Sequence, residues 1–142
     1  MTAVLELPTG WSKIPLGKLV DVSTGYAFRS SDYIDDGVFV LRVTNIEPSG
    51  NITREDAKYF PPSRVKGKYE KFILQDGDVL LVMVGGSLGK IGRVEAQILP
   101  ALLNQNMWRF RSVPNGPSSE FIHLLLRFVN KYQLKITNST HG

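Results

Sequence analysis

Residues 74–95 read LQDGDVLLVMVGGSLGKIGRVE, which places a turn, an unbroken apolar run and a glycine-rich break in succession. Gln75–Asp78 has the composition of a turn. The apolar run Val79–Val84 predicts a short central strand, because a strand that is buried on both faces shows no polar alternation. Gly85–Gly89 ends that strand, and Lys90–Glu95 is expected to return beside it as the second strand of a hairpin.

Two more strands and one helix are predicted around this hairpin. Val38–Ile46 is rich in β-branched and aromatic residues, and Asn104–Ser112 alternates in polarity. A helix is expected from Ser118 or Ser119, whose hydroxyl can cap it, to about Leu134. Its expected apolar stripe comprises Phe121, Ile122, Leu125, Phe128, Val129 and Tyr132. This pattern indicates an α+β fold, with a β-rich twisted-sheet core, short helices and one longer C-terminal helix.

The composition is that of one globular domain. The chain has 142 residues, of which 42% are hydrophobic, and this is enough for a core of its own. The absence of cysteine excludes disulfides, thiolate zinc sites and iron–sulfur clusters. Neither a signal peptide nor an apolar run long enough for a membrane span is visible, so a cytoplasmic location without membrane contact is expected.

The positive charge is concentrated in one segment. The formal net charge is +4, and residues 54–71 hold six cations and three acids, so three of the four net charges lie there. Asn51–Lys71 is expected to be an irregular loop, because Pro61, Pro62 and Gly67 interrupt it. Lysine and arginine neutralise DNA phosphates, which makes this loop a candidate DNA contact. The alternative is a charged loop that only faces solvent.

Known catalytic motifs are incomplete in this sequence. Gly85–Lys90 lacks the glycine spacing of a phosphate loop and the Ser or Thr that would follow its lysine. Tyr59–Pro62 shares the composition but not the order of a methyltransferase tetrapeptide. Asp76 and Asp78 are best explained by the turn, and no Gly-x-Ser-x-Gly elbow occurs. The chain is therefore expected to be non-catalytic, with no cofactor and no metal.

Seven short motifs follow one another along the chain. They are Leu7-Pro8-Thr9-Gly10-Trp11 with Leu16-Gly17, Gly25–Ser30, Val40–Ile46, Leu74–Leu80, Gly86–Gly92, Leu103–Arg109 and Ser139–Gly142. Each motif alone is weak, but their order and spacing resemble the target-recognition domains of type I restriction-modification specificity subunits. The resemblance spans nearly the whole chain.

The resemblance implies one DNA target-recognition domain over residues 1–142, with the start of a conserved helical region at about 137–142. Such a domain recognises one half of a bipartite double-stranded DNA target. A methyltransferase (modification) subunit and a restriction subunit, which use S-adenosylmethionine and ATP, do the chemistry. The family would assign a scaffold role to Trp11, Asp78, Asn104 and Gln105.

Other partnerships remain open at this point. The chain could be a protein-interaction module that docks a DNA methyltransferase subunit, or the recognition domain of a fused restriction-methylation enzyme. Self-association of two copies through exposed apolar surface is a further hypothesis.

Nine residues are expected to contact DNA. They come from the basic segment, from two upstream arginines and from the glycine-rich hairpin: Arg29, Arg42, Lys58, Arg64, Lys66, Lys68, Lys71, Ser87 and Lys90. Lys66, Lys68 and Lys90 are the expected phosphate contacts. Arg42 and Arg64 are candidate base readers, because a guanidinium can form paired hydrogen bonds with a base edge.

Overall fold

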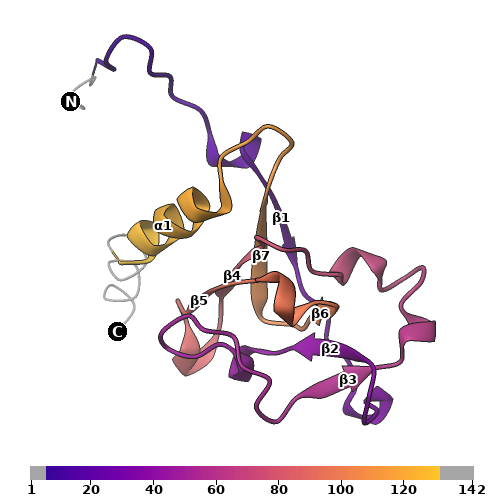
Figure 1. Ribbon diagram of the computed structural model, residues 1–142. Helices are drawn as coiled ribbons and strands as arrows, with labels where there is room; N and C mark the ends of the chain where they lie inside the picture. Colours follow the sequence, from indigo (N-terminus) through magenta and orange to yellow (C-terminus); the bar gives the residue numbers. More distant parts are fainter. Residues whose placement is uncertain (1–5, 132–142) are drawn as a thin grey trace.

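Short apolar runs separated by turns form two β-sheets and one α-helix in the computed structural model, which describes residues 6–131 (Figure 1). Three clusters of buried side chains hold these elements in layers. One cluster lies between the helix α1 (Ser119–Val129) and the larger sheet, and a second joins the larger sheet to the smaller one. The third cluster covers the outer face of the smaller sheet.

The larger sheet contains four antiparallel strands in the order β1–β7–β4–β5. They are β1 (Val20–Thr24), β7 (Met107–Ser112), β4 (Val79–Val82) and β5 (Ile91–Arg93). The predicted hairpin is confirmed, because β5 returns directly beside β4. Leu80 and Val82 join the cluster between the sheets, whereas Val79 and Leu81 join the cluster under α1. Burial on both faces explains the unbroken apolar run.

The smaller sheet contains three strands in the order β3–β2–β6. They are β3 (Lys58–Phe60), β2 (Val38–Leu41) and β6 (Ala101–Leu103). β2 pairs antiparallel with β3 and parallel with β6. Phe39 and Leu41 belong to the cluster between the sheets, and Val40 belongs to the outer cluster. β2 is therefore buried on both faces and places the outer cluster on a rigid support.

Several predicted strand boundaries are wrong. The strand predicted over 38–46 ends at Leu41, because the chain turns where the Asn45 N–H donates to the Arg42 carbonyl at 2.8 Å. The Arg42 N–H in turn donates to Asn45 Oδ1 at 2.9 Å. The strand predicted over 104–112 begins only at Met107, and the sequence does not predict β1 or β6. These short strands are defined by distant partners rather than by local periodicity.

The segment 51–71 is not the irregular loop that the sequence predicts. It contains β3 and two single-turn 3₁₀ helices, Pro62–Arg64 and Glu70–Phe72. Phe60 is fully buried in the outer cluster, and Tyr69 packs against the same cluster. Aromatic burial therefore orders a segment whose prolines and charges suggested a loop.

α1 begins where predicted, since the Ser118 hydroxyl accepts the Phe121 N–H at 3.2 Å. The predicted apolar stripe is confirmed for Ile122 but is wrong for Phe121 and Phe128. The buried residues of α1 are Ile122 and Leu126, whereas Phe121 and Phe128 are 51% and 57% exposed. Ile122 and Leu126 are one helical turn apart, and they are the α1 residues in the cluster against the larger sheet. Only part of the apolar surface of the helix is therefore covered.

Part of the prediction lies outside the described residues. This holds for Tyr132, for the helix end near Leu134 and for the conserved region at 137–142. Over residues 6–131, no helix has the length and apolar character needed to cross a bilayer.

A buried ion-pair network braces the larger sheet. The fully buried Asp78 carboxylate accepts two hydrogen bonds from the Arg111 guanidinium, at 2.7 and 2.8 Å, and one from the Gln75 N–H at 2.7 Å. The hydrogen bond to Asp78 raises the pKa of Arg111. Two residues earlier in β7, the Arg109 guanidinium pairs with the Asp21 carboxylate of β1 at 2.7 Å. The expected scaffold role of Asp78 is confirmed.

The other residues with an expected scaffold role differ. Trp11 is 71% exposed, on an N-terminal segment that extends away from the sheets in Figure 1, so this expectation is wrong for Trp11. Gln105 is also exposed. Asn104 is half-buried, and its backbone N–H donates to the Leu41 carbonyl at 3.0 Å.

Candidate nucleic-acid interface

Five aromatic rings cover the outer face of the smaller sheet. This aromatic cluster consists of Tyr26, Phe28, Phe60, Tyr69 and Phe72, and its neighbouring ring centroids lie 5.0–6.3 Å apart. Val40 and Leu102 of the sheet complete the buried layer beneath it. The rings come from the segment after β1 and from residues 60–72, so the cluster ties two distant parts of the sequence together.

Gly25 lets the first of these rings reach the sheet. A Cβ at position 25 would lie 1.7 Å from the Asn104 carbonyl oxygen, so only glycine permits this approach. The next residue, Tyr26, donates its N–H to the Leu103 carbonyl at 3.0 Å. The backbone of β6 therefore sets the position of the Tyr26 ring.

Three basic side chains stand over the aromatic cluster. The Lys68 ammonium lies 4.9 Å from the Tyr26 ring centroid and 5.3 Å from that of Tyr69. The Arg64 guanidinium lies 5.1 Å from the Phe60 centroid, and the Lys71 ammonium lies over Phe72 at 5.2 Å. The ring faces attract and orient these cations.

A cavity of about 220 Å³ opens among these groups. This Tyr26 pocket is lined by Tyr26, Arg29, Asp32, Arg64, Lys68 and Tyr69. It combines three cations and two phenol hydroxyls with a single carboxylate, so it attracts anions. Asp32 accepts a hydrogen bond from Arg64 at 3.0 Å, which raises the pKa of Arg64 and orients its guanidinium.

Lys68 and Tyr26 are electrostatically coupled. The ammonium of Lys68 donates to the Tyr26 hydroxyl oxygen at 2.9 Å. This hydrogen bond lowers the pKa of Tyr26 and raises the pKa of Lys68. The pocket therefore holds the Lys68 ammonium beside the Tyr26 hydroxyl, and the hydrogen bond between them favours the charged form of Lys68.

Three of the nine predicted DNA contacts, Arg29, Arg64 and Lys68, line one pocket although they are far apart in sequence. Lys71 lies on the same aromatic cluster. Lys66 is exposed and borders a separate hollow. The DNA contacts themselves stay predictions.

The remaining predicted residues lie in other settings. Arg42 donates to the Asp56 carbonyl at 2.6 Å, and Lys58 pairs with the Asp56 carboxylate at 3.5 Å. The Lys90 ammonium donates to the Val43 and Ile46 carbonyls at 3.1 and 2.5 Å. These bonds give Arg42 and Lys90 structural roles.

Ser87 lies in the 3₁₀ turn Gly85–Ser87, between β4 and β5. Its carbonyl accepts the Lys90 N–H at 3.1 Å, which closes the hairpin. The prediction placed Lys90 beside Ser87 on a DNA phosphate, but the Lys90 ammonium instead reaches the turn that follows β2.

The sequence-based site omits three residues that line the pocket, Tyr26, Asp32 and Tyr69. Tyr26 stands in the motif Gly25–Ser30, which also contains Phe28 and Arg29. The signal that would have found it is that this motif and the basic segment both interleave aromatic and basic residues. Asp32 has no such signal, because only the fold brings it to Arg64.

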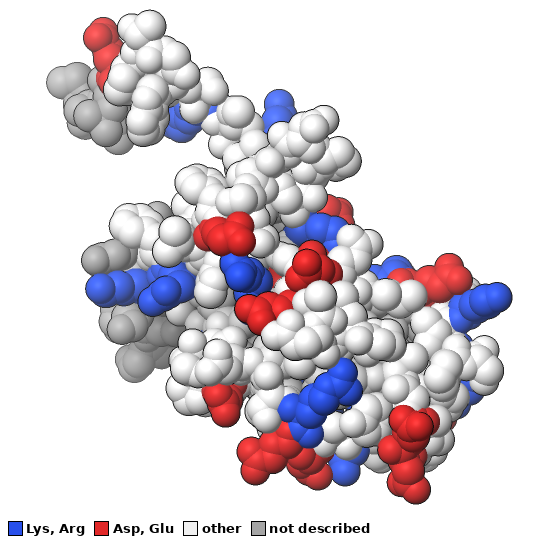
Figure 2. Space-filling model, viewed as in Figure 1, with Lys and Arg blue, Asp and Glu red and all other residues white. Residues whose placement is uncertain are grey.

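Charge is mixed on the face of the molecule shown in Figure 2. Basic and acidic side chains alternate there, and no continuous basic surface covers it. The net charge of the chain therefore does not locate a DNA-binding face, and the local grouping of cations has to do so.

Residues 8–142 match the family described as "Type I restriction modification DNA specificity domain". The chain is 30% identical over 125 residues to the type I restriction enzyme MjaVIII specificity subunit of Methanocaldococcus jannaschii. The matched region covers 85% of this chain and 29% of that subunit. The chain is 28% identical over 131 residues to the type I restriction enzyme EcoAI specificity subunit of Escherichia coli, covering 88% of this chain and 22% of the relative. The chain thus spans less than a third of either subunit.

Solved structures share the fold. The HsdS subunit from Thermoanaerobacter tengcongensis matches with a TM-score of 0.66 at 18% identity, over 89% of this chain and 29% of that one. The type I restriction-modification S subunit from M. genitalium matches with a TM-score of 0.59 at 16% identity, over 89% and 28%. These matches confirm the α+β fold class. Because the family match covers nearly all of the sequence, the chain belongs to the type I restriction-modification DNA specificity domain family.

Proposed function

We propose that this chain is a sequence-specific DNA-binding domain whose Tyr26 pocket receives a phosphate of the DNA backbone. The observation that carries the proposal is the convergence of Arg29, Arg64 and Lys68 on one cavity. A phosphate fits this donor set, because charged nitrogens and hydroxyls can bond its oxygens together. Phosphate contacts set the register of a protein on a duplex, and other side chains then read the bases.

The same proposal places the chain in a type I restriction-modification system. It would recognise one half of a bipartite target in the cytoplasm, without chemistry of its own, while modification and restriction subunits methylate and cleave. The relatives' names as specificity subunits support this role. The family description as a DNA specificity domain supports it independently.

The test is the salt dependence of DNA binding by Lys68→Ala and Arg64→Ala. Each lost phosphate contact should reduce the slope of log affinity against log salt by about one, for every DNA sequence tried. The matched control is Lys13→Ala, which removes an exposed charge from the N-terminal segment and should leave the slope unchanged. Binding to a random-sequence duplex at low salt supplies the measurable signal.

The outcome decides between a phosphate site and a solvated charge cluster. If both pocket variants keep the slope of the unmodified chain, the Tyr26 pocket does not bind phosphate and the proposal is wrong. If Lys13→Ala lowers the slope as much as the pocket variants do, the effect reflects total charge only.

A further inference from the structure

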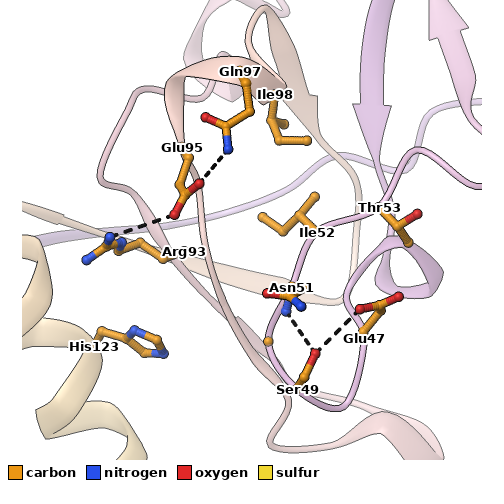
Figure 3. Close-up of a pocket in the computed structure, with 11 residues that line it drawn as sticks. Glu47, Ser49, Asn51, Ile52, Thr53, Arg93, Glu95, Gln97, Ile98 and His123 are labelled. Atoms are coloured by element: carbon orange, nitrogen blue, oxygen red, sulfur yellow. Dashed lines mark hydrogen bonds and ion pairs between the residues drawn. The ribbon is translucent and has the colours of Figure 1, made fainter.

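A second concave region lies on the molecule, formed by elements other than those of the Tyr26 pocket. A cavity of about 640 Å³ is bounded by the loop after β2, by the end of β5 and by α1 (Figure 3). Its wall includes Glu47, Ile52, Arg93, Glu95 and His123, and Figure 3 shows these side chains arranged around the opening. We call it the acidic cavity.

The acidic cavity combines carboxylates with apolar side chains. Glu47 and Glu95 supply carboxylates from two elements, and Ile52 and Ile98 supply apolar surface. Arg93 offsets only part of this charge, because its guanidinium is shared between Glu95 at 3.9 Å and Glu120 at 3.1 Å, and Glu95 also accepts a hydrogen bond from Gln97. Two carboxylates against one shared guanidinium leave the cavity with an excess of negative charge. A long basic side chain matches this combination, since its stem can lie on apolar groups while its head reaches carboxylates.

His123 adds no positive charge at neutral pH. Its burial, followed by the nearby charges of Arg127 and Arg93, lowers the pKa of the imidazole. The imidazole lines both the acidic cavity and a neighbouring one.

The neighbouring cavity, of about 330 Å³, has the opposite charge. It shares Ser49 and His123 with the acidic cavity, and its wall includes Arg127, Lys131 and Lys90, whose ammonium is already hydrogen-bonded to backbone carbonyls. We call it the basic cavity. The Asn130 amide donates to the Gly89 carbonyl at 2.7 Å, which holds the end of α1 against the hairpin between β4 and β5. The two cavities thus form one groove with a negative and a positive end.

We propose that this groove is a docking site for a segment of a partner protein that carries an arginine or lysine followed or preceded by an aspartate or glutamate. The basic side chain enters the acidic cavity and the acidic side chain enters the basic one. A polypeptide can present both charges, whereas a nucleic-acid backbone presents only negative charge and is repelled by Glu47 and Glu95. The groove therefore serves a function that is separate from DNA binding at the Tyr26 pocket.

The probe is a set of peptides, acetyl-Arg-linker-Glu-amide, with glycine linkers of increasing length, titrated into the full chain by NMR. Backbone amide shifts are expected at Ser49, Asn51, Ile52 and Gln97, with one linker length binding best because it spans the two cavities. The Glu47→Gln/Glu95→Gln double variant should weaken that peptide about tenfold, since two charge-assisted contacts are lost. A peptide with citrulline in place of arginine should bind as weakly.

Arg127→Gln tests the other end and should weaken the Arg–Glu peptide while leaving a peptide with Arg alone unaffected. Lys68→Ala is the matched control, because it alters the Tyr26 pocket and should leave peptide binding unchanged whether or not DNA binds there. No amide shifts near the groove, or equal binding of the citrulline peptide, would overturn the proposal. So would duplex DNA that shifts the same amides and displaces the peptide, because the groove would then belong to the nucleic-acid surface.

Discussion

Both sheets carry basic side chains, but the two sheets use them in opposite ways. On the larger sheet, Arg109 and Arg111 are held by carboxylates, and one of these, Asp78, is completely buried. Over the smaller sheet, Lys68 and Arg64 stand against aromatic rings at the mouth of a cavity, and the carboxylate that pairs with Arg64, that of Asp32, is partly exposed. A cation whose partner is a buried carboxylate is structural, whereas a cation whose partner is an aromatic ring or an exposed group stays available to a ligand. The partner's environment therefore decides the role, rather than the choice of lysine or arginine.

The physical reason lies in desolvation. A buried carboxylate such as Asp78 needs its cation, because an unpaired charge inside the protein is costly. An aromatic face attracts a cation without neutralising it, so Lys68 keeps its charge and its donors for an anion. Four predictions test this division, beginning with the largest effect.

Asp78→Asn should destabilise the chain by about 3–5 kcal/mol, because it leaves Arg111 without its buried partner and removes a carboxylate charge 3.9 Å from Arg109. Urea unfolding measures the loss. Asp76→Asn, in the exposed part of the same turn, is the control and should change stability by less than about 0.5 kcal/mol. Equal effects of the two substitutions would show that the buried network does not support the larger sheet.

Gly25→Ala should cost about 1–3 kcal/mol, because the new methyl group collides with the backbone of Asn104, directly after β6, and of Leu103 at its end. It should also weaken DNA binding, since Tyr26 is the adjacent residue and loses its place in the pocket. Gly17→Ala is matched to it, because nothing lies near a Cβ at that position. An unchanged unfolding free energy for Gly25→Ala would mean that β6 does not position the pocket.

Arg42→Ala should cost about 1 kcal/mol of stability, through loss of its hydrogen bond to the Asp56 carbonyl. The salt slope of DNA binding should stay the same, which places Arg42 with the structural cations. Lys58→Ala, which removes only a surface pair with Asp56, should cost less. If Arg42→Ala lowered the salt slope of DNA binding without changing stability, Arg42 would instead be a DNA contact.

The smallest expected effect is on the pH dependence of binding. Because the hydrogen bond from Lys68 lowers the pKa of Tyr26, this phenol should ionise before an ordinary tyrosine as the pH rises. Its negative charge then opposes a phosphate, so DNA affinity should fall on the alkaline side, and Tyr26→Phe should remove this early fall. Tyr33→Phe is the control, since burial raises the pKa of Tyr33. The measurement is DNA affinity against pH at constant ionic strength, and identical profiles for the three proteins would contradict the coupling.

The sequence predicted part of the candidate site. The basic segment was recognisable because Arg64, Lys68 and Lys71 are close together in the chain and interleaved with aromatic residues. Arg29 was found only through the motif around it. The pocket could not be predicted, because Tyr26 and Asp32 join the basic segment through β2 and β3 pairing and through ring packing. Such contacts depend on residues that are more than thirty positions apart, as in the Asp32–Arg64 pair.

Local sequence by itself determined the hairpin of β4 and β5 and the start of α1. In both cases the signals are neighbours in the chain: an apolar run ended by glycines, and a serine that caps the helix. Tertiary structure decided which face of α1 is buried, where β1 and β6 form, and which cations meet over the aromatic cluster. Those outcomes follow from burial and strand pairing between distant segments, which the local periodicity of the sequence does not predict.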